Sequence, residues 1–203
     1  ERDLPTLAGH RAGAKTLKQT VKDSVKLGLE ELCVYAFSTE NWSRPTDEVG
    51  GLMAMFAELI VSETPELDEE GVRMRFVGRR EGISERLQEQ MDWAEAETAS
   101  NDRLALFVAF NYGGRAEILD AAERYAGGGE EAFAANLYAP EMSDPDIVIR
   151  TSGEERLSNF LLWQSAYSEL IFTDLLWPDF DLGALQAALD EFAARGRRFG
   201  ARG

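Results

Sequence analysis

Two arginines, two serines and a glycine stand close together at Arg150, Ser152, Gly153, Arg156 and Ser158. A guanidinium group is a planar fork of donors that matches phosphate oxygens, and serine hydroxyls add further donors. Glycine lets the backbone approach a bound group closely. This combination indicates one binding site for a phosphate or a diphosphate.

A predicted strand places this loop. Residues 147–149 are three β-branched apolar residues, which is typical of a buried strand. Arg150 would then emerge at the carboxyl end of the strand, where open α/β sheets bind their ligands. The alternative is a surface loop whose arginines make ordinary ion pairs with Glu154 and Glu155.

Other polar residues follow predicted strands or lie near their ends, and a parallel sheet would gather them along one edge. Among them, Asn41 is a neutral group that could orient a substrate, and Glu169 is a carboxylate suited to Mg²⁺. A magnesium ion would stabilise the charge that develops on a leaving diphosphate. The side chains expected at this edge are Ser38, Glu40, Asn41, Arg44, Arg150, Arg156, Ser158 and Glu169.

An apolar groove is expected beside the polar edge. The predicted helix over residues 49–60 carries a wide stripe of flexible and aromatic side chains, and residues 104–110 form an apolar strand. Together they predict a substrate with a diphosphate head and an apolar tail. From periodicity alone, the same stripe also fits a plain helix core.

Strands and helices alternate along the chain, which predicts an α/β fold with a mostly parallel central sheet, helices on both faces and an apolar tunnel beside the sheet. The length of 203 residues fits one domain over residues 1–203. Strands are expected at 32–37, 72–77, 104–110, 147–149 and 170–173, and helices at 9–28, 46–60, 84–100, 115–125, 130–137 and 181–195.

Composition excludes several classes of function. The net charge of −16 argues against a nucleic-acid or anionic-membrane surface, so any anion site must be a local basic pocket. The four lysines lie on one face of the first predicted helix and are interpreted as a solvated stripe. The single cysteine, Cys33, provides no disulfide framework and no zinc spacing, which favours a cytoplasmic protein, with a peripheral place at the membrane as the alternative.

Three blocks of the sequence resemble the cis-prenyltransferases, whose bacterial type is undecaprenyl diphosphate synthase. The longest runs from Arg150-Thr-Ser-Gly-Glu to Glu169-Leu and is followed by Trp177-Pro-Asp-Phe, and the others are residues 35–45 and 111–115. The resemblance covers essentially the whole chain. It implies a magnesium-dependent enzyme that adds isopentenyl diphosphate to an allylic diphosphate such as farnesyl diphosphate, with a cis double bond in each added unit.

The resemblance also implies roles for single residues, carried over by matching positions. Asn41 would assist proton removal, Glu169 would help to place magnesium, and His10, in Gly-His-x-x-Gly, would contact the allylic diphosphate. Isopentenyl diphosphate would be held by Arg150, Arg156 and Ser158. The remaining substrate-binding positions are Leu157 and, in a loop over residues 38–50 that closes on substrate, Ser38, Thr39, Glu40, Trp42 and Arg44.

Product length and assembly are further implications of the resemblance. Ala36 is small, and the resemblance links a small residue at this position to enzymes that make long products. The implied product has about ten or eleven isoprene units and is delivered to the membrane as a carrier lipid. Arg198-Phe199-Gly200 resembles an Arg-x-Gly element that reaches into the partner subunit, which implies a homodimer. A frayed basic tail is the alternative for that sequence.

The match has two gaps. The family's Asp-Gly-Asn block, which supplies a magnesium-binding Asp and a phosphate loop, should precede His10 and is not in this sequence, and with it one strand of the family's six is expected to be missing. Thr6 also stands where many members have Arg. A non-catalytic partner or lipid-binding subunit is therefore the alternative function. A nucleotide-binding α/β enzyme is disfavoured because neither G-x-G-x-x-G nor a Walker loop is present.

Overall fold

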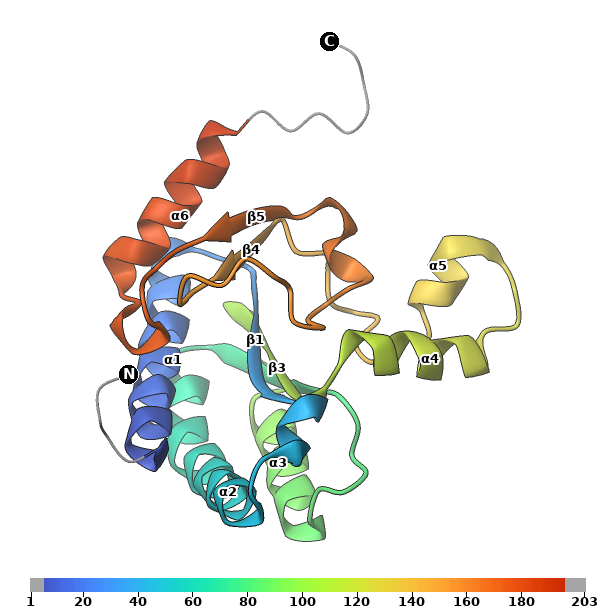
Figure 1. Ribbon diagram of the computed structural model, residues 1–203, viewed down its shortest axis with the longest axis horizontal. Coiled ribbons are helices and arrows are strands. Elements are labelled where there is room, and N and C mark those ends of the chain that lie inside the picture. Colours follow the sequence, from blue (N-terminus) through green and yellow to red (C-terminus); the bar gives the residue numbers. More distant parts are fainter. Residues whose placement is uncertain (1–5, 196–203) are drawn as a thin grey trace.

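The computed structural model describes residues 6–195, with side chains from residue 8 onward. Helices and parallel strands alternate along the chain (Figure 1). The elements are α1 (Thr6–Leu27), β1 (Glu31–Ser38), a 3-10 turn (Thr39–Ser43), α2 (Thr46–Glu69), β2 (Val72–Val77), α3 (Glu85–Glu97), β3 (Leu104–Tyr112), α4 (Gly114–Arg124), α5 (Gly129–Ala134), β4 (Ile147–Arg150), 3-10 turns at Gln164–Tyr167 and Trp177–Asp179 on either side of β5 (Glu169–Phe172), and α6 (Leu182–Ala194).

The predicted parallel α/β fold is confirmed, but the strands divide into two sheets. One sheet has the order β1-β3-β2 and the other pairs β4 with β5, and every pairing is parallel. Within residues 6–195, β1 has no strand partner on its second edge, and neither has β4. The sixth strand that the resemblance implies lies outside the described residues.

Strand β3 is the centre of the core, and all nine of its residues are buried. On one face, Leu104, Leu106, Val108 and Phe110 belong to the cluster that includes the inner sides of α2 and α3. The other face packs against loop residues, among them Leu161. Because both faces are covered, the strand is a continuous apolar run without alternation.

Helices α2 and α3 begin close to where the sequence predicts. Ser84 caps α3 by accepting a hydrogen bond from the Leu87 N–H, as expected for a serine at this position. Thr46 is the first helical residue of α2, as the predicted range 46–60 has it, and Pro45 occupies the cap position without a side-chain bond. Asp47 and Glu48 in the first turn suit the positive end of the helix dipole.

Helix α1 is fixed from the opposite end of the chain. The indole Nε1 of Trp177 donates to the Gly13 carbonyl at 2.9 Å, and the Thr16 hydroxyl donates to the Pro178 carbonyl at 3.2 Å. A Cβ at Gly13 would lie 3.1 Å from the Trp177 ring, so a glycine permits this close approach.

Over residues 6–195, no helix is both long enough and apolar enough to cross a bilayer.

Candidate active site

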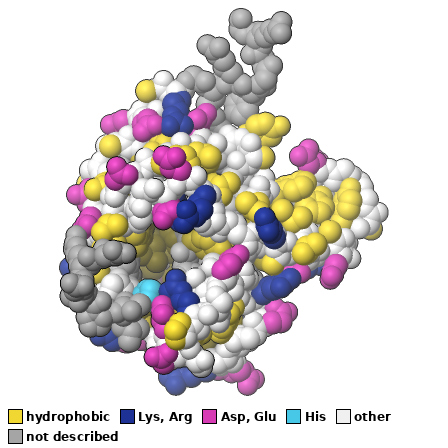
Figure 2. Space-filling model, viewed as in Figure 1, with side chains coloured by type: hydrophobic (Ala, Val, Ile, Leu, Met, Phe, Trp, Pro, Cys, Tyr) yellow, Lys and Arg dark blue, Asp and Glu magenta, His cyan; other side chains and the backbone are white. Residues whose placement is uncertain are grey.

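A cavity of about 1360 Å³ lies between the two sheets and helices α1 and α2. Figure 2 shows it as a hollow with hydrophobic side chains on its floor and charged side chains at its rim. The apolar wall on the α2 side comprises Leu52, Met55, Phe56, Leu59, Ile60, Met74, Phe76, Leu106, Val108 and Phe110. The predicted combination of a polar edge and an apolar groove is therefore present.

The same cavity continues between the free edges of β1 and β4. Cys33 and Tyr35 line it from β1, and Ile147 and Ile149 line it from β4. This second part lies between β1 and β4, which belong to different sheets and each have one edge without a strand partner in the described chain. The cavity thus has a groove under α2 and a slot between the sheets.

Arg150 lies at the carboxyl end of β4 and lines the cavity, as predicted. Its guanidinium makes no ion pair within the described residues. The chain then turns sharply, and Ser152 and Gly153 have φ values of 72° and 67°. Their N–H groups donate to the carbonyls of Leu175 and Thr173, so Gly153 permits the turn and its amide is not available to a ligand.

Arg156 differs from Arg150 in its surroundings. Its side chain is 65% exposed and pairs with Glu154, which is the ordinary ion pair considered as the alternative for this loop. Arg156 and Leu157 nevertheless line the cavity, whereas Ser158 lies in the same loop with a φ of 51° and does not. Both arginines therefore line the cavity. Arg156 must leave Glu154 before it binds an anion, whereas Arg150 has no such ion pair within the described residues.

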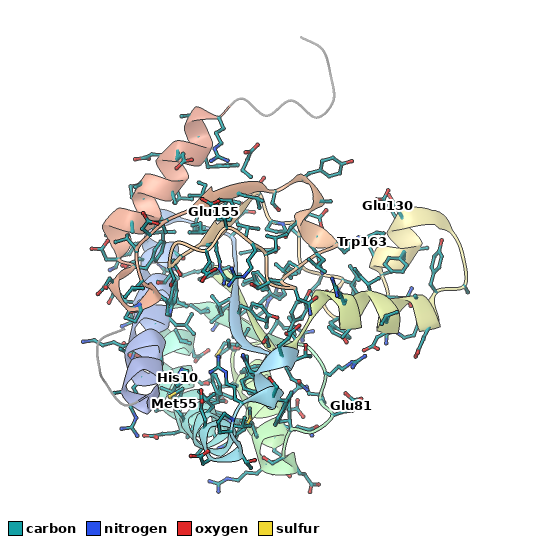
Figure 3. All side chains as sticks on the ribbon, in the orientation of Figure 1. His10, Met55, Glu81, Glu130, Glu155 and Trp163 are labelled. Atoms are coloured by element: carbon teal, nitrogen blue, oxygen red, sulfur yellow. The ribbon has the colours of Figure 1, made fainter. Side chains whose placement is uncertain are left out.

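Across the mouth, α1 meets the start of α2. Arg44 Nη1 lies 2.9 Å from Glu48 Oε1, and His10 Nε2 lies 3.6 Å from the same oxygen. His10 on α1 and Met55 on α2, both labelled in Figure 3, line the cavity. Glu48, which sequence reasoning did not select, pairs with Arg44 and lies beside His10, whose Nε2 makes no hydrogen bond within the described residues. Its place one turn after Arg44 was the available signal.

Asn41 lines the mouth from the turn between β1 and α2. Its Oδ1 accepts a hydrogen bond from the Ser38 N–H at 2.9 Å, so its Nδ2 is the group left to contact a ligand. The neighbouring predicted residues Ser38, Thr39, Glu40 and Trp42 do not line the cavity. Of the predicted residues between 38 and 44, only Asn41 and Arg44 therefore line the cavity.

Tyr35 is a cavity residue that the sequence did not single out. Its ring stacks on Phe160 at a centroid distance of 4.7 Å, and its hydroxyl donates to the Tyr112 carbonyl at 3.1 Å. Burial and the nearby Glu40 carboxylate raise the pKa of Tyr35 to about 12, although Ser38 and Arg150 oppose the shift. Tyr35 is therefore a neutral donor at pH 7, positioned near Arg150.

Glu169 does not lie with the other predicted residues. It begins β5 and pairs with Ile147 at the amino end of β4, whereas Arg150 pairs with Phe172 at the other end. Three residues of strand separate the two ends by roughly 10 Å. Arg195 Nη1 binds the Glu169 carboxylate at 2.8 Å. Within residues 6–195, no group of three His, Cys, Asp or Glu side chains could hold a metal ion, so these residues do not by themselves fit a magnesium site.

Ala36 and the terminal residues complete the set of predictions. Ala36 lines the cavity and packs against the core cluster under α2, so a larger side chain there would enter the groove. The side chain of Thr6 and the residues Arg198, Phe199 and Gly200 lie outside the described parts of the chain. Their predicted roles stay predictions.

Comparison with known proteins adds independent evidence. A family model described as "Putative undecaprenyl diphosphate synthase" matches residues 1–200. The isoprenyl transferase of Thermotoga maritima is 48% identical over 98% of this chain and 90% of its own length. The ditrans,polycis-undecaprenyl-diphosphate synthase of Xanthomonas axonopodis, described as specific for (2E,6E)-farnesyl diphosphate, is 45% identical over 98% of this chain and 82% of its own length.

A solved structure agrees with these sequence matches. The lavandulyl diphosphate synthase of Lavandula x intermedia, solved in complex with dimethylallyl diphosphate, has a TM-score of 0.93 and 30% sequence identity, covering 98% of this chain and 91% of that one. The predicted resemblance is thereby confirmed over nearly the whole chain. The chain belongs to the cis-prenyltransferase family, the family of undecaprenyl diphosphate synthase, and is a prenyltransferase.

Proposed function

We propose that this protein condenses isopentenyl diphosphate with an allylic diphosphate, such as farnesyl diphosphate, to build a long polyprenyl diphosphate. One observation carries the proposal: a single cavity joins an arginine-bearing polar mouth to an apolar groove under α2. A diphosphate fits the mouth because guanidinium groups bind phosphate oxygens, and a prenyl chain fits the groove because burial removes its apolar surface from water.

Each side chain at the mouth is assigned one part in the proposed reaction. In each cycle a bond forms between C4 of isopentenyl diphosphate and C1 of the allylic chain as the bond from C1 to the allylic diphosphate breaks. The isopentenyl unit then loses one proton from C2, which would pass to the released diphosphate with the assistance of Asn41. Arg150 and Arg156 would hold the isopentenyl diphosphate, and His10 and Arg44 stand where the second diphosphate would lie. The Nδ2 of Asn41 would orient a substrate oxygen, and the apolar wall would exclude water from the reacting carbons.

The test is incorporation of labelled isopentenyl diphosphate onto farnesyl diphosphate, with products resolved by length. We expect a ladder that ends at long products, and we expect EDTA to abolish it. Diphosphate oxygens would supply some of the magnesium ligands, because residues 6–195 offer no cluster of three metal-binding side chains. Binding of farnesyl diphosphate without any incorporation would instead support a lipid-binding partner subunit. Incorporation that survives EDTA would remove the magnesium requirement.

We also propose a homodimer whose product is delivered to the membrane. Support comes from the exposed apolar side chains over α4 and α5 in Figure 2, where Leu119 is 64% exposed. A surface of this kind on a chain with net charge −16 favours contact with another protein. Sedimentation velocity should give about twice the chain mass of 22.6 kDa, and Leu119→Glu should shift it towards one chain. A single-chain mass for the unmodified protein would contradict the dimer.

A further inference from the structure

The turn over Thr39–Ser43 carries Asn41 to the cavity mouth, yet little apolar packing holds it. Glu40, Trp42 and Ser43 are all exposed, and the main ring contact is the edge of Trp42 against Phe37, at a centroid distance of 5.2 Å. Segments with few buried contacts open at low free-energy cost. The position of this turn therefore depends on a small number of directed hydrogen bonds.

Asn111 makes one of these bonds from the end of β3. Its side chain is buried, and its Nδ2 donates to the carbonyls of Arg79 and Glu81 at 3.0 and 2.9 Å. With both donors fixed, its Oδ1 must face Trp42, whose Nε1 donates to it at 2.7 Å. The φ of Asn111 is 51°, a left-handed conformation that asparagine tolerates better than most residues.

Asn159 makes the second bond from the loop after β4. Its Nδ2 donates to Glu40 Oε1 at 2.7 Å, and its Oδ1 accepts from the Arg115 N–H at the start of α4. Its φ is 65°. Burial raises the pKa of Glu40, but hydrogen bonds, led by the one from Asn159, outweigh it and lower that pKa, so Glu40 is charged at neutral pH.

The two asparagines connect the turn to different parts of the mouth. Asn111 belongs to the central strand, whereas Asn159 lies in the loop over residues 151–159 that follows Arg150 and contains Arg156, here called the arginine loop. Gly113 allows this close assembly, because a Cβ there would lie 2.6 Å from Thr39 Oγ1 and 2.8 Å from Asn159 Nδ2. The charged hydrogen bond from Asn159 to Glu40 thus joins the arginine loop to the turn.

We propose that Asn159 and Asn111 are positioning residues that fix the Thr39–Ser43 turn against the arginine loop, so that Asn41 is held beside the bound diphosphates. This inference rests on the proposed function for its catalytic consequence. Its structural part, that these two side chains hold the turn, stands on the contacts alone.

Asn159→Asp removes the hydrogen bond from Asn159 to Glu40 and leaves the bond from Trp42 to Asn111 unchanged. Aspartate keeps the acceptor for the Arg115 N–H and tolerates the same φ, and a carboxylate suits the start of α4, so thermal stability should not fall. It loses the donor to Glu40 and faces that carboxylate with a second one. We expect kcat to fall about tenfold with a smaller change in KM, and backbone amide exchange across residues 39–44 to rise.

Rescue distinguishes positioning from general damage. In the double variant Asn159→Asp with Glu40→Gln, the glutamine amide donates to the new carboxylate and restores the bond with donor and acceptor reversed. Its kcat and its exchange at residues 39–44 should return close to those of Glu40→Gln alone. No loss in Asn159→Asp, or a loss that the double variant does not recover, would overturn the role of Asn159.

Trp42→Phe tests the bond to Asn111, because phenylalanine keeps the ring against Phe37 and removes only the Nε1 donor. Exchange at residues 39–44 should rise and kcat should fall by several fold. Trp93→Phe, on the exposed side of α3, is the matched control and should change neither. Equal results for the two variants would overturn the role of Asn111.

If the unmodified protein elongates no prenyl chain, the proposed function fails, while the exchange measurements still decide whether the asparagines hold the turn.

Discussion

Replacing Arg150 with alanine should raise the KM for isopentenyl diphosphate about a hundredfold, with a much smaller change in the KM for the allylic substrate. Arg150 lines the cavity and makes no ion pair within the described residues, so its charge is available to the ligand. A hydrogen bond to a charged group contributes about 1.5–3 kcal/mol, and a forked arginine makes two of them. Steady-state kinetics with each substrate varied in turn provide the measurement.

Arg156→Ala gives the informative comparison. Because its guanidinium is 65% exposed and must leave Glu154 before it binds an anion, its removal should raise the same KM less than removal of Arg150 does. Arg86→Ala, on α3 and outside the cavity, should leave both KM values unchanged. An unaltered KM for isopentenyl diphosphate in Arg150→Ala would remove this residue from the proposed site.

Replacing Ala36 with phenylalanine should shorten the products by several isoprene units. The new ring would extend into the apolar groove that the growing chain is proposed to occupy, so elongation would stop when the chain reaches it. The first condensation, which needs less of the groove, should keep a rate within a fewfold of the unmodified protein. Products extracted and resolved by length measure the effect.

Ala96→Phe is the matched control, since Ala96 is exposed on α3 and does not line the cavity. It should give the same ladder as the unmodified protein. If Ala36→Phe also gives that ladder, the chain either does not grow past Ala36 or finds another path, and the predicted role of Ala36 is wrong.

Local patterns predicted most elements of the fold, although α2 continues to Glu69, past the predicted end at residue 60. A β-branched run located β4, alternation located β2, and β1 and the fully buried β3 appeared as continuous apolar runs. Arg150 was placed correctly because a loop that follows a parallel strand must begin at its carboxyl end. These inferences need only the order of residues along one strand.

The errors arose where a contact depends on distant segments. Glu169 was expected at the same edge as the arginines, but it lies at the amino end of β5, where Arg195 from the end of α6 binds it. The hydrogen bonds of Trp42 with Asn111 and of Glu40 with Asn159 join residues 69 and 119 positions apart. No periodicity in the sequence marks such pairs, so only the folded chain reveals them.

The division of the strands into two sheets was also not predicted, because it too depends on contacts between distant segments. Strand pairing in a parallel sheet is set by tertiary packing, and the sequence of β1 does not specify which strand lies at its second edge. The free edges of β1 and β4 both border the cavity, so the slot between them is the place where a sixth parallel strand would complete one sheet. The resemblance predicts such a strand.

The most direct test of the account is a crystal structure with bound farnesyl thiodiphosphate, a slow-reacting allylic analogue, using a chain that includes any residues encoded ahead of Glu1. The account predicts the prenyl tail in the groove between α2 and β1, with Ala36 along its path and the diphosphate at the mouth near His10 and Arg44. A sixth strand bonded to both β1 and β4 would leave that groove open. A tail bound elsewhere, or a groove closed by the added residues, would contradict the proposed function.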